Sequence, residues 1–258
     1  MRVAAIQHDI VWERPAENHA RLAPRIAEAA AAGAQLVALS EMYATGFSMN
    51  AGRIAEPPEG PSTAFLADQA RAHGVWVCAS VPTRVEANRR PTNRLVLAGP
   101  LGEHHHYDKL HPFSYAGEHD HYAGGEHVVT CTIEGVRVTP FVCYDLRFAD
   151  DFWAAARDTD MYLVVANWPA ARRTHWQILL RARAVENQAY VLGVNRVGAG
   201  DGIDYAGDSV VVDPFGEVIA ESLDPTERIV VADVEAARVR EVRAHYPFLR
   251  DRRTFASD

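Results

Sequence analysis

VRVTPFVCYDLRF, residues 136–148, is the stretch from which the fold of this 258-residue chain can best be predicted. Its β-branched and aromatic residues predict a buried strand that ends at Cys143, and the run ADDFWAAARD that follows predicts an amphipathic helix. Cys143 would then lie at a helix N-terminus, where the helix dipole and unpaired N–H groups lower the pKa of a thiol and can hold an oxyanion. A lone cysteine is more often a small buried hydrophobe, so other residues must decide.

Outward from this stretch, strands alternate with helices, which predicts a layered α/β fold. Strands are expected at residues 2–7, 35–39, 75–81, 94–98, 161–167, 189–195 and 228–233. Helices are expected at residues 17–32, 63–73, 174–187 and 235–245. Hairpins at residues 128–139, turning at Glu134-Gly135, and at residues 209–221 add antiparallel pairs. No linker divides the chain, so residues 1–258 are predicted to form a single domain.

Composition argues against several classes of protein. The net charge of −8 and the pI near 5.8 disfavour a general affinity for nucleic acid or anionic lipid. Three widely spaced cysteines predict neither a disulfide framework nor a thiolate zinc site, and they favour a reducing compartment. The chain has no apolar run near the ~18 residues of a membrane-spanning helix and no signal-peptide core. We therefore expect a cytoplasmic protein that binds neither nucleic acid nor membrane.

Residues 102–127, GEHHHYDKLHPFSYAGEHDHYAGGEH, are expected to form an irregular loop with a function, because the segment is long and unusual in composition. Its histidines, including 104–106 and the pair His119 and His121, suggest a metal site. Glu118 and Asp120 interleave that pair, however, and turn residues are frequent, so histidines that are exposed to solvent or that support a neighbouring site residue are favoured. We predict no metal.

A thiol that hydrolyses an amide needs a base and a charge that stabilises the oxyanion. Two residues can supply them. Glu41 follows the strand predicted at residues 35–39, and Lys109 lies in the loop predicted at residues 102–127. Each alone is weak support, since a glutamate after a strand and a lysine in a polar loop are usually solvated.

Three motifs together carry more weight: LSEMYATGF at residues 39–47, YDKLHPF at 107–113 with AGE following, and VCYDLRF at 142–148. They resemble the three motif regions of the carbon–nitrogen hydrolase (nitrilase) superfamily. Further similarity lies in AAIQHDIVWERPAENHARL, NWPAARRTHWQILLRARAVENQAYVLGVNRVG and GDSVVVDPFGEVIA, so the resemblance covers nearly the whole chain. The motifs CYDLRF, NWPA and AGEHDHY are most similar to bacterial omega-amidase-type members, which hydrolyse the terminal amide of 2-oxoglutaramate-like acids.

The resemblance implies a role for each matching residue. Glu41 would be the general base, Cys143 the nucleophile that forms a thioester acyl-enzyme, and Lys109 the cation that stabilises the oxyanion. The backbone N–H of Tyr144 would complete the oxyanion hole. Glu118 would orient Lys109 and the leaving group. On this view no metal or other cofactor takes part.

The resemblance also implies the architecture, a four-layer α-β-β-α sandwich with two mixed β-sheets. It further implies a homodimer that packs through the helix after Cys143 and the helix at residues 174–187.

Substrate recognition is predicted to depend on Arg147, four residues after Cys143. Its guanidinium would bind a carboxylate of a short substrate that carries the amide at its other end. The structural alternative is an ion pair with Asp145 or Asp150, and Arg172 is the reserve candidate for the carboxylate. Three aromatic residues that follow the motif residues are expected to form the apolar sides of the pocket: Tyr43, Phe113 and Trp168.

Other functions share the same residues. A nitrilase, or an amidase of N-acyl or N-carbamoyl substrates, would use the same Glu-Lys-Cys set, and the acyl group could pass to an amine instead of water. A metal-binding or partner-binding protein without activity would be favoured had Glu41, Lys109 or Cys143 been replaced, but all three are present.

Overall fold

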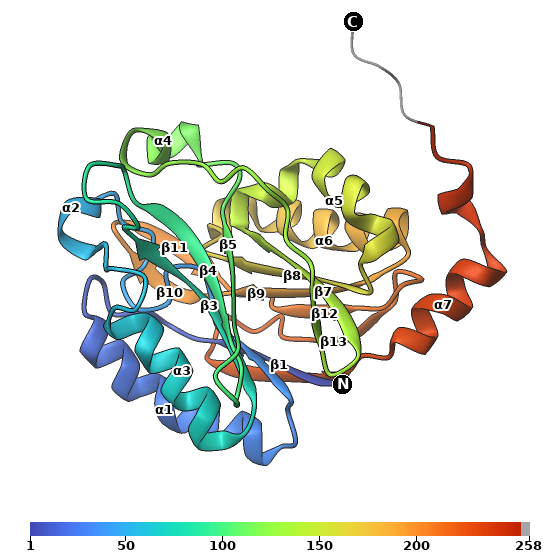
Figure 1. The fold of residues 1–258 in the computed structure, drawn as a ribbon, viewed down its shortest axis with the longest axis horizontal. Helices are drawn as coiled ribbons and strands as arrows, with labels where there is room; N and C mark the ends of the chain where they lie inside the picture. Colours follow the sequence, from blue (N-terminus) through green and yellow to red (C-terminus); the bar gives the residue numbers. More distant parts are fainter. Residues whose placement is uncertain (254–258) are drawn as a thin grey trace, which may run out of the picture.

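The computed structural model describes residues 1–253, which form two six-stranded mixed β-sheets (Figure 1). The first sheet has the order β14 (Arg228–Asp233), β1 (Arg2–Gln7), β2 (Leu36–Ala38), β3 (Trp76–Thr83), β4 (Thr92–Ala98) and β5 (His104–Asp108). The second has the order β13 (Val218–Glu221), β12 (Val210–Val212), β9 (Tyr190–Asn195), β8 (Met161–Ala166), β7 (Val136–Val142) and β6 (Cys131–Ile133). Both sheets place parallel pairs at the centre and antiparallel pairs outside.

Helices cover the outer face of each sheet (Figure 1). The first sheet carries α1 (Pro15–Ala31) and α3 (Pro61–His73), and the second carries α5 (Ala149–Ala155) and α6 (Arg173–Asn187). Three shorter or peripheral helices are α2 (Ala51–Ile54), α4 (Glu118–His121) and α7 (Ala236–His245). A separate hairpin consists of β10 (Val197–Gly200) and β11 (Ile203–Ala206). This arrangement confirms the predicted four-layer sandwich.

Strand β1 shows why the central strands read as continuous apolar runs. Val3 and Ala5 belong to the core between the two sheets, whereas Ala4 and Ile6 belong to the core beneath α1 and α3. Because side chains alternate between faces and both faces are covered, every position of the strand after Arg2 is buried.

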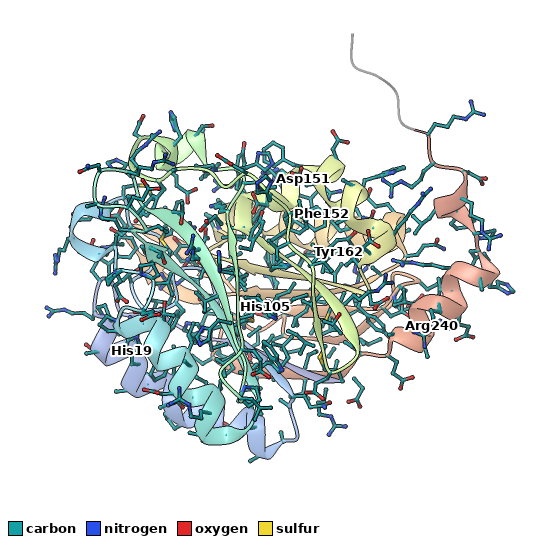
Figure 2. The ribbon with its side chains drawn as sticks, viewed as in Figure 1. His19, His105, Asp151, Phe152, Tyr162 and Arg240 are labelled. Carbon is teal, nitrogen blue, oxygen red and sulfur yellow. The ribbon has the colours of Figure 1, made fainter. Side chains whose placement is uncertain are left out.

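The helical layers lie on opposite sides of the molecule. In Figure 2, His19 on α1 marks one layer, and Phe152 on α5 lies close to Tyr162 on β8 on the other side. The Tyr162 hydroxyl donates to the Phe152 carbonyl, and the two ring centroids are 4.9 Å apart. Within residues 1–253, no helix combines the length and the apolar character that crossing a bilayer requires.

Most predicted elements are confirmed within a few residues, including the turn at Glu134 and Gly135, which both have positive φ. The irregular loop predicted at residues 102–127 is wrong in part, since its start is β5. This strand lies at the edge of the sheet, so its outward side chains are free to be polar, while Tyr107 is buried and His105 stacks on Trp76.

Candidate active site

Cys143 lies where β7 ends, at the first residue of the 3₁₀ segment η2 (Cys143–Arg147). Its backbone φ is +46°, a strained value for a non-glycine residue, and such strain occurs where a side chain is held for a function. The helix predicted over the run ADDFWAAARD is confirmed, since α5 begins at Ala149, but Cys143 lies in η2, ahead of this helix, and not at its N-terminus. The thiol is therefore presented by a tight turn, which we call the cysteine turn (residues 142–147).

Asp145 holds the cysteine turn in place. Its buried carboxylate accepts hydrogen bonds from the backbone N–H of Val142 at 3.0 Å, the N–H of His111 at 2.9 Å and the Tyr107 hydroxyl at 2.8 Å. Burial raises the pKa of Asp145 to about 6 despite these donors. Because Tyr107 and His111 flank Lys109 in the sequence, the same carboxylate fixes the lysine segment relative to the thiol.

Three predicted catalytic side chains, Glu41, Lys109 and Glu118, form a charge cluster beneath the thiol. Lys109 Nζ donates to Glu41 Oε1 at 2.9 Å and to Glu118 Oε2 at 2.8 Å. The side chains of both carboxylates are 0% exposed and that of Lys109 is 1% exposed. The structure thus brings these residues together, although nearly 80 residues separate the two glutamates in the sequence.

Two asparagines that sequence reasoning missed support this cluster. Asn93, on β4, donates through Nδ2 to Glu41 Oε1 at 2.8 Å and to Glu118 Oε1 at 3.2 Å. Asn167, just after β8, donates its backbone N–H to Glu41 Oε2 at 2.8 Å and its Nδ2 to the Glu41 carbonyl at 2.6 Å. The sequence does carry a signal for Asn167, which is a polar residue at the end of an apolar strand. Asn93 has no comparable signal, because it is one of several residues within a strand.

The electrostatics of the thiol differ from the prediction. Burial raises the pKa of Cys143, the Glu41 carboxylate raises it further, and the opposing effect of Lys109 is smaller, so the pKa lies well above the usual value. The expected lowering by a helix dipole is wrong here, because a negative carboxylate lies beside the sulfur. For Lys109, burial alone would lower the pKa, but Glu118 and Glu41 outweigh it and the net shift is upward.

A cavity of about 120 Å³ opens above the thiol, and we call it the thiol pocket. Its lining includes six of the site residues predicted from the sequence: Cys143, Tyr144, Arg147, Phe113, Trp168 and Arg172. It also includes residues that sequence reasoning did not single out, among them Phe47, Met49, Asn167, Asp201, Ile203 and Tyr205. The last three come from the β10–β11 segment, whose glycine-rich sequence did not read as a hairpin.

Both predicted arginines reach this pocket, and each lies over an aromatic ring. The guanidinium of Arg147 is 4.9 Å from the Trp168 ring centroid, and its Nη2 donates to His175 Nδ1 at 3.1 Å. The guanidinium of Arg172 is 5.4 Å from the Phe113 ring centroid. The ion pair considered for Arg147 does not form with Asp145, whose oxygens accept the three donors described above.

Tyr43 was expected beside the substrate, and this is wrong. The side chain is 0% exposed and belongs to the core beneath α1 and α3, where its ring stacks with those of His19 and Phe65. Its hydroxyl donates to the carbonyl of Ser62 at 2.7 Å. Met42, between Glu41 and Tyr43, has a positive φ of +41°, and the chain changes direction there. Glu41 and Tyr43 therefore lie in different environments.

Comparison with known sequences agrees with this geometry. The profile of the carbon–nitrogen hydrolase family matches residues 2–244. The chain belongs to the carbon–nitrogen hydrolase family. This carbon–nitrogen hydrolase is 38% identical to the omega-amidase YafV of Escherichia coli K12, over 97% of this chain and 96% of that protein. It is 30% identical to the 2-oxoglutaramate amidase of Bacillus subtilis, over 96% of each.

A solved structure supports the same family. A CN-hydrolase superfamily protein from Xanthomonas campestris, with an arsenic adduct in its active site, has a TM-score of 0.93 and 38% identity, and the match covers 100% of this chain and 99% of that one. The predictions of the superfamily, the sandwich fold and an enzyme that hydrolyses carbon–nitrogen bonds are confirmed.

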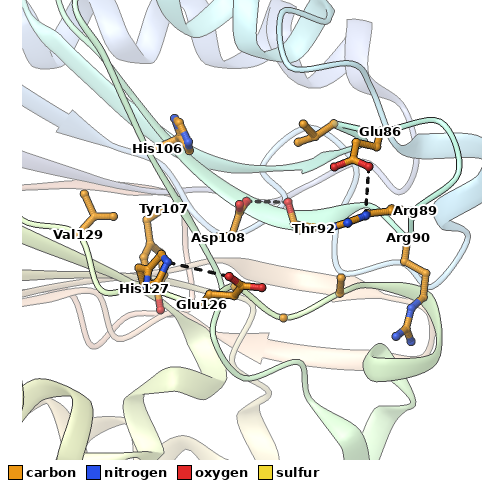
Figure 3. Close-up of a pocket in the computed structure, with 14 residues that line it drawn as sticks. Glu86, Arg89, Arg90, Thr92, His106, Tyr107, Asp108, Glu126, His127 and Val129 are labelled. Carbon is orange, nitrogen blue, oxygen red and sulfur yellow. Dashed lines mark hydrogen bonds and ion pairs between the residues drawn. The ribbon is translucent and has the colours of Figure 1, made fainter.

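This carbon–nitrogen hydrolase has a second, larger cavity of about 370 Å³ on the other face of β4 and β5 (Figure 3). Figure 3 shows Thr92, His106, Asp108, Glu126 and His127 along it, with Thr92 bound to Asp108. No group of three or more metal-binding side chains within residues 1–253 is placed to hold an ion.

Proposed function

We propose that this enzyme is an omega-amidase, which hydrolyses the terminal amide of a short dicarboxylic acid such as 2-oxoglutaramate and releases ammonia. One observation carries the proposal: the thiol pocket contains both Cys143, which lies beside the charge cluster, and two arginines, Arg147 and Arg172. A nucleophile and a site for a carboxylate thus share one cavity. The names of the E. coli and B. subtilis relatives support the same substrate class.

In the acylation step, Glu41 takes the thiol proton as the Cys143 sulfur attacks the amide carbon. The carbonyl oxygen becomes an oxyanion, held by Lys109 Nζ and the backbone N–H of Tyr144. Glu41 then gives its proton to the amide nitrogen, the C–N bond breaks, and ammonia leaves a thioester on Cys143.

In the second step, Glu41 takes a proton from water, and the resulting hydroxide attacks the thioester carbon. The C–S bond breaks, the carboxylic acid leaves, and the sulfur recovers its proton. The raised pKa of the thiol means that the resting enzyme holds little thiolate, so proton transfer to Glu41 must accompany the attack. Glu118 keeps Lys109 directed at this site through the 2.8 Å hydrogen bond.

The choice of substrate depends on the part of the thiol pocket that contains the two arginines. Arg147 or Arg172 binds the carboxylate of the substrate by charge-assisted hydrogen bonds, and Trp168 and Phe113 contact its carbon chain. The pocket volume of about 120 Å³ suits a molecule of about five carbons better than a large amide.

The test is ammonia release from a panel of small substrates by the purified enzyme. We expect a five-carbon omega-amide with a free carboxylate to be hydrolysed at least ~100-fold faster, in kcat/KM, than its methyl ester, an alpha-carboxylate amide or the matching nitrile. Equal rates on the free acid and its methyl ester would disprove the omega-amidase assignment and leave the Glu-Lys-Cys chemistry standing.

We also infer a homodimer. Apolar side chains on α5 and α6 remain exposed in the single chain: Trp153 is 39% exposed, Ile178 60% and Val185 53%. Such side chains on the outer layer of a sandwich are favourable contacts for a second copy. Light scattering after size exclusion should give twice the 28.5 kDa mass of the chain, and Ile178→Glu should shift it toward one copy.

We further infer one domain over residues 1–258, of which 254–258 lie outside the described residues, and a cytoplasmic location. A single core cluster that includes residues of both sheets supports the first inference. Three free cysteines, Cys78, Cys131 and Cys143, support the second, because a reducing compartment preserves thiols.

A further inference from the structure

Among residues 1–253, Asn93 is the one neutral side chain that donates a hydrogen bond to both carboxylates of the charge cluster. It is 1% exposed, and its Nδ2 lies 2.8 Å from Glu41 Oε1 and 3.2 Å from Glu118 Oε1. Lys109 makes the same kind of bridge from its own side, at 2.9 and 2.8 Å. Two donors, one charged and one neutral, therefore lie between two like charges that would otherwise repel each other.

The backbone of β4 fixes where this amide lies. The Asn93 carbonyl accepts the backbone N–H of Lys109 at 3.0 Å, so the asparagine contacts the lysine segment through its main chain as well. Its neighbours in the strand, Thr92 and Arg94, bind Asp108 at 2.6 and 2.7 Å on the opposite face, where Figure 3 shows Thr92 and Asp108. Alternation along the strand thus directs only Asn93 to the charge cluster.

The orientation of the amide follows from chemistry. Two carboxylate oxygens can only accept, so the NH₂ group must face them. The Oδ1 atom of Asn93 is then buried and has no hydrogen-bond partner within residues 1–253. An unsatisfied buried acceptor is destabilising, so the arrangement gives up stability in order to place a donor between the two glutamates.

We propose that Asn93 is a positioning residue that determines which oxygen of Glu41 acts as the base. This inference rests on the proposed function. Glu41 Oε1 accepts hydrogen bonds from both Asn93 and Lys109, whereas Oε2 accepts, within the described part of the chain, only the N–H of Asn167. Oε2 therefore retains the free lone pair and takes the proton of the thiol.

The test is the pH dependence of kcat in Asn93→Asp and Asn93→Ala. Both changes remove the hydrogen bond that Nδ2 donates to the carboxylate, so the acid limb of the activity profile moves to higher pH. We expect a shift of about one unit or more and a fall in kcat of about 10-fold to 100-fold at neutral pH, with little change in KM. The shift is larger for aspartate, which also adds a third carboxyl group.

Asn187→Asp is the matched control. Asn187 is also fully buried and donates through Nδ2 to the Arg183 carbonyl, and its Oδ1 has no partner among the residues that the structure describes. It lies at the end of α6, away from the charge cluster. This variant should keep the wild-type acid limb. Thermal unfolding of each variant shows whether lost activity reflects unfolded enzyme or a change in the folded site. If Asn93→Asp does not fold, the acid limb of Asn93→Ala tests the inference.

An unchanged acid limb in both Asn93 variants, or an equal shift in Asn187→Asp, overturns the inference and makes Asn93 a structural residue only. Cys143→Ala, assayed alongside, distinguishes this outcome from failure of the proposed function. If Cys143→Ala is inactive while the Asn93 variants behave like wild type, only the inference fails. If Cys143→Ala keeps a tenth of wild-type turnover, the proposed function itself fails.

Discussion

The charge cluster and the arginines of the thiol pocket hold their charges in different ways. In the charge cluster, Glu41, Lys109 and Glu118 are at most 1% exposed and are bound to one another at 2.8–2.9 Å. In the pocket, Arg147 and Arg172 are partly exposed and lie over aromatic rings at 4.9 and 5.4 Å.

On the proposed function, this difference separates the residues that carry out the reaction from the residues that select the substrate. A buried ion cannot leave its partners without a cost of several kcal/mol, so the charge cluster is fixed before substrate arrives. An arginine held by a ring face can change its rotamer at little cost and adapt to a ligand. Changes in the charge cluster should therefore reduce turnover of every substrate, whereas changes at the arginines should alter the ratio between substrates.

The largest effect is expected at Cys143, which lines the thiol pocket and lies beside the charge cluster. Cys143→Ala should lower kcat by at least ~10⁴-fold on every amide, because it removes the covalent step, and it should leave the melting temperature nearly unchanged, since the side chain is half-buried. Cys131→Ala is the control and should retain activity. Ammonia release and thermal unfolding check both, and mass mapping should find an alkylating reagent on Cys143 before Cys78.

Lys109 should be almost as sensitive. Lys109→Arg should fail nearly as badly as Lys109→Met, because a planar guanidinium cannot replace a compact ammonium between two carboxylates. Lys109→Met should also lower the free energy of unfolding by about 3–5 kcal/mol, since it leaves two buried carboxylates without a cation. Denaturant unfolding measures this loss, and an arginine variant with wild-type kcat would contradict the prediction.

Glu41→Gln should lower kcat by at least ~10²-fold by removing the base. The same change should lower the pKa of the Cys143 thiol, because the Glu41 carboxylate raises it in the wild type. The variant would thus have more thiolate and less activity. Absorbance at 240 nm as a function of pH, with Cys143→Ala subtracted, measures the thiolate. A midpoint as high as in the wild type would mean that Glu41 does not act on the sulfur.

Sequence reasoning placed the charged residues of the site better than the groups around them. Glu41, Lys109, Glu118 and Cys143 come from short motifs, and the strands that carry them have apolar runs that are read easily. Tyr43 was misplaced because one residue with positive φ, Met42, turns the chain into a different core. Such a turn has no reliable sequence signal for a methionine.

The pKa of the thiol was also mispredicted, for a physical reason. A local rule about helix ends considered only the cysteine turn, whereas the shift comes from burial and from Glu41, about a hundred residues away in the sequence. Asn93 was missed for the same reason, since its role depends on contacts between β4 and two distant glutamates. Fold and motif can be predicted locally, but electrostatics requires the assembled site.

A smaller and more selective effect is expected at Arg147. Arg147→Met should lower kcat/KM for a five-carbon omega-amide by about 10-fold to 100-fold, the value of one or two charge-assisted hydrogen bonds, and should hardly change hydrolysis of the methyl ester. Arg172→Met tests the second candidate in the same assay. Arg181→Met, an exposed arginine on α6, is the control. Equal losses on both substrates would place Arg147 in the chemistry instead.

The smallest effect, none, is expected from chelators. In a metal-dependent amidase a cation neutralises the oxyanion and activates water. In the mechanism that we propose, Lys109 Nζ, 2.9 Å and 2.8 Å from the two carboxylates, supplies the positive charge, and Glu41 supplies the base. Dialysis against EDTA should therefore leave kcat unchanged. The histidines at residues 104–106 lie on β5, and a loss of activity that zinc restores would point to them and show that the charge cluster is not sufficient for catalysis.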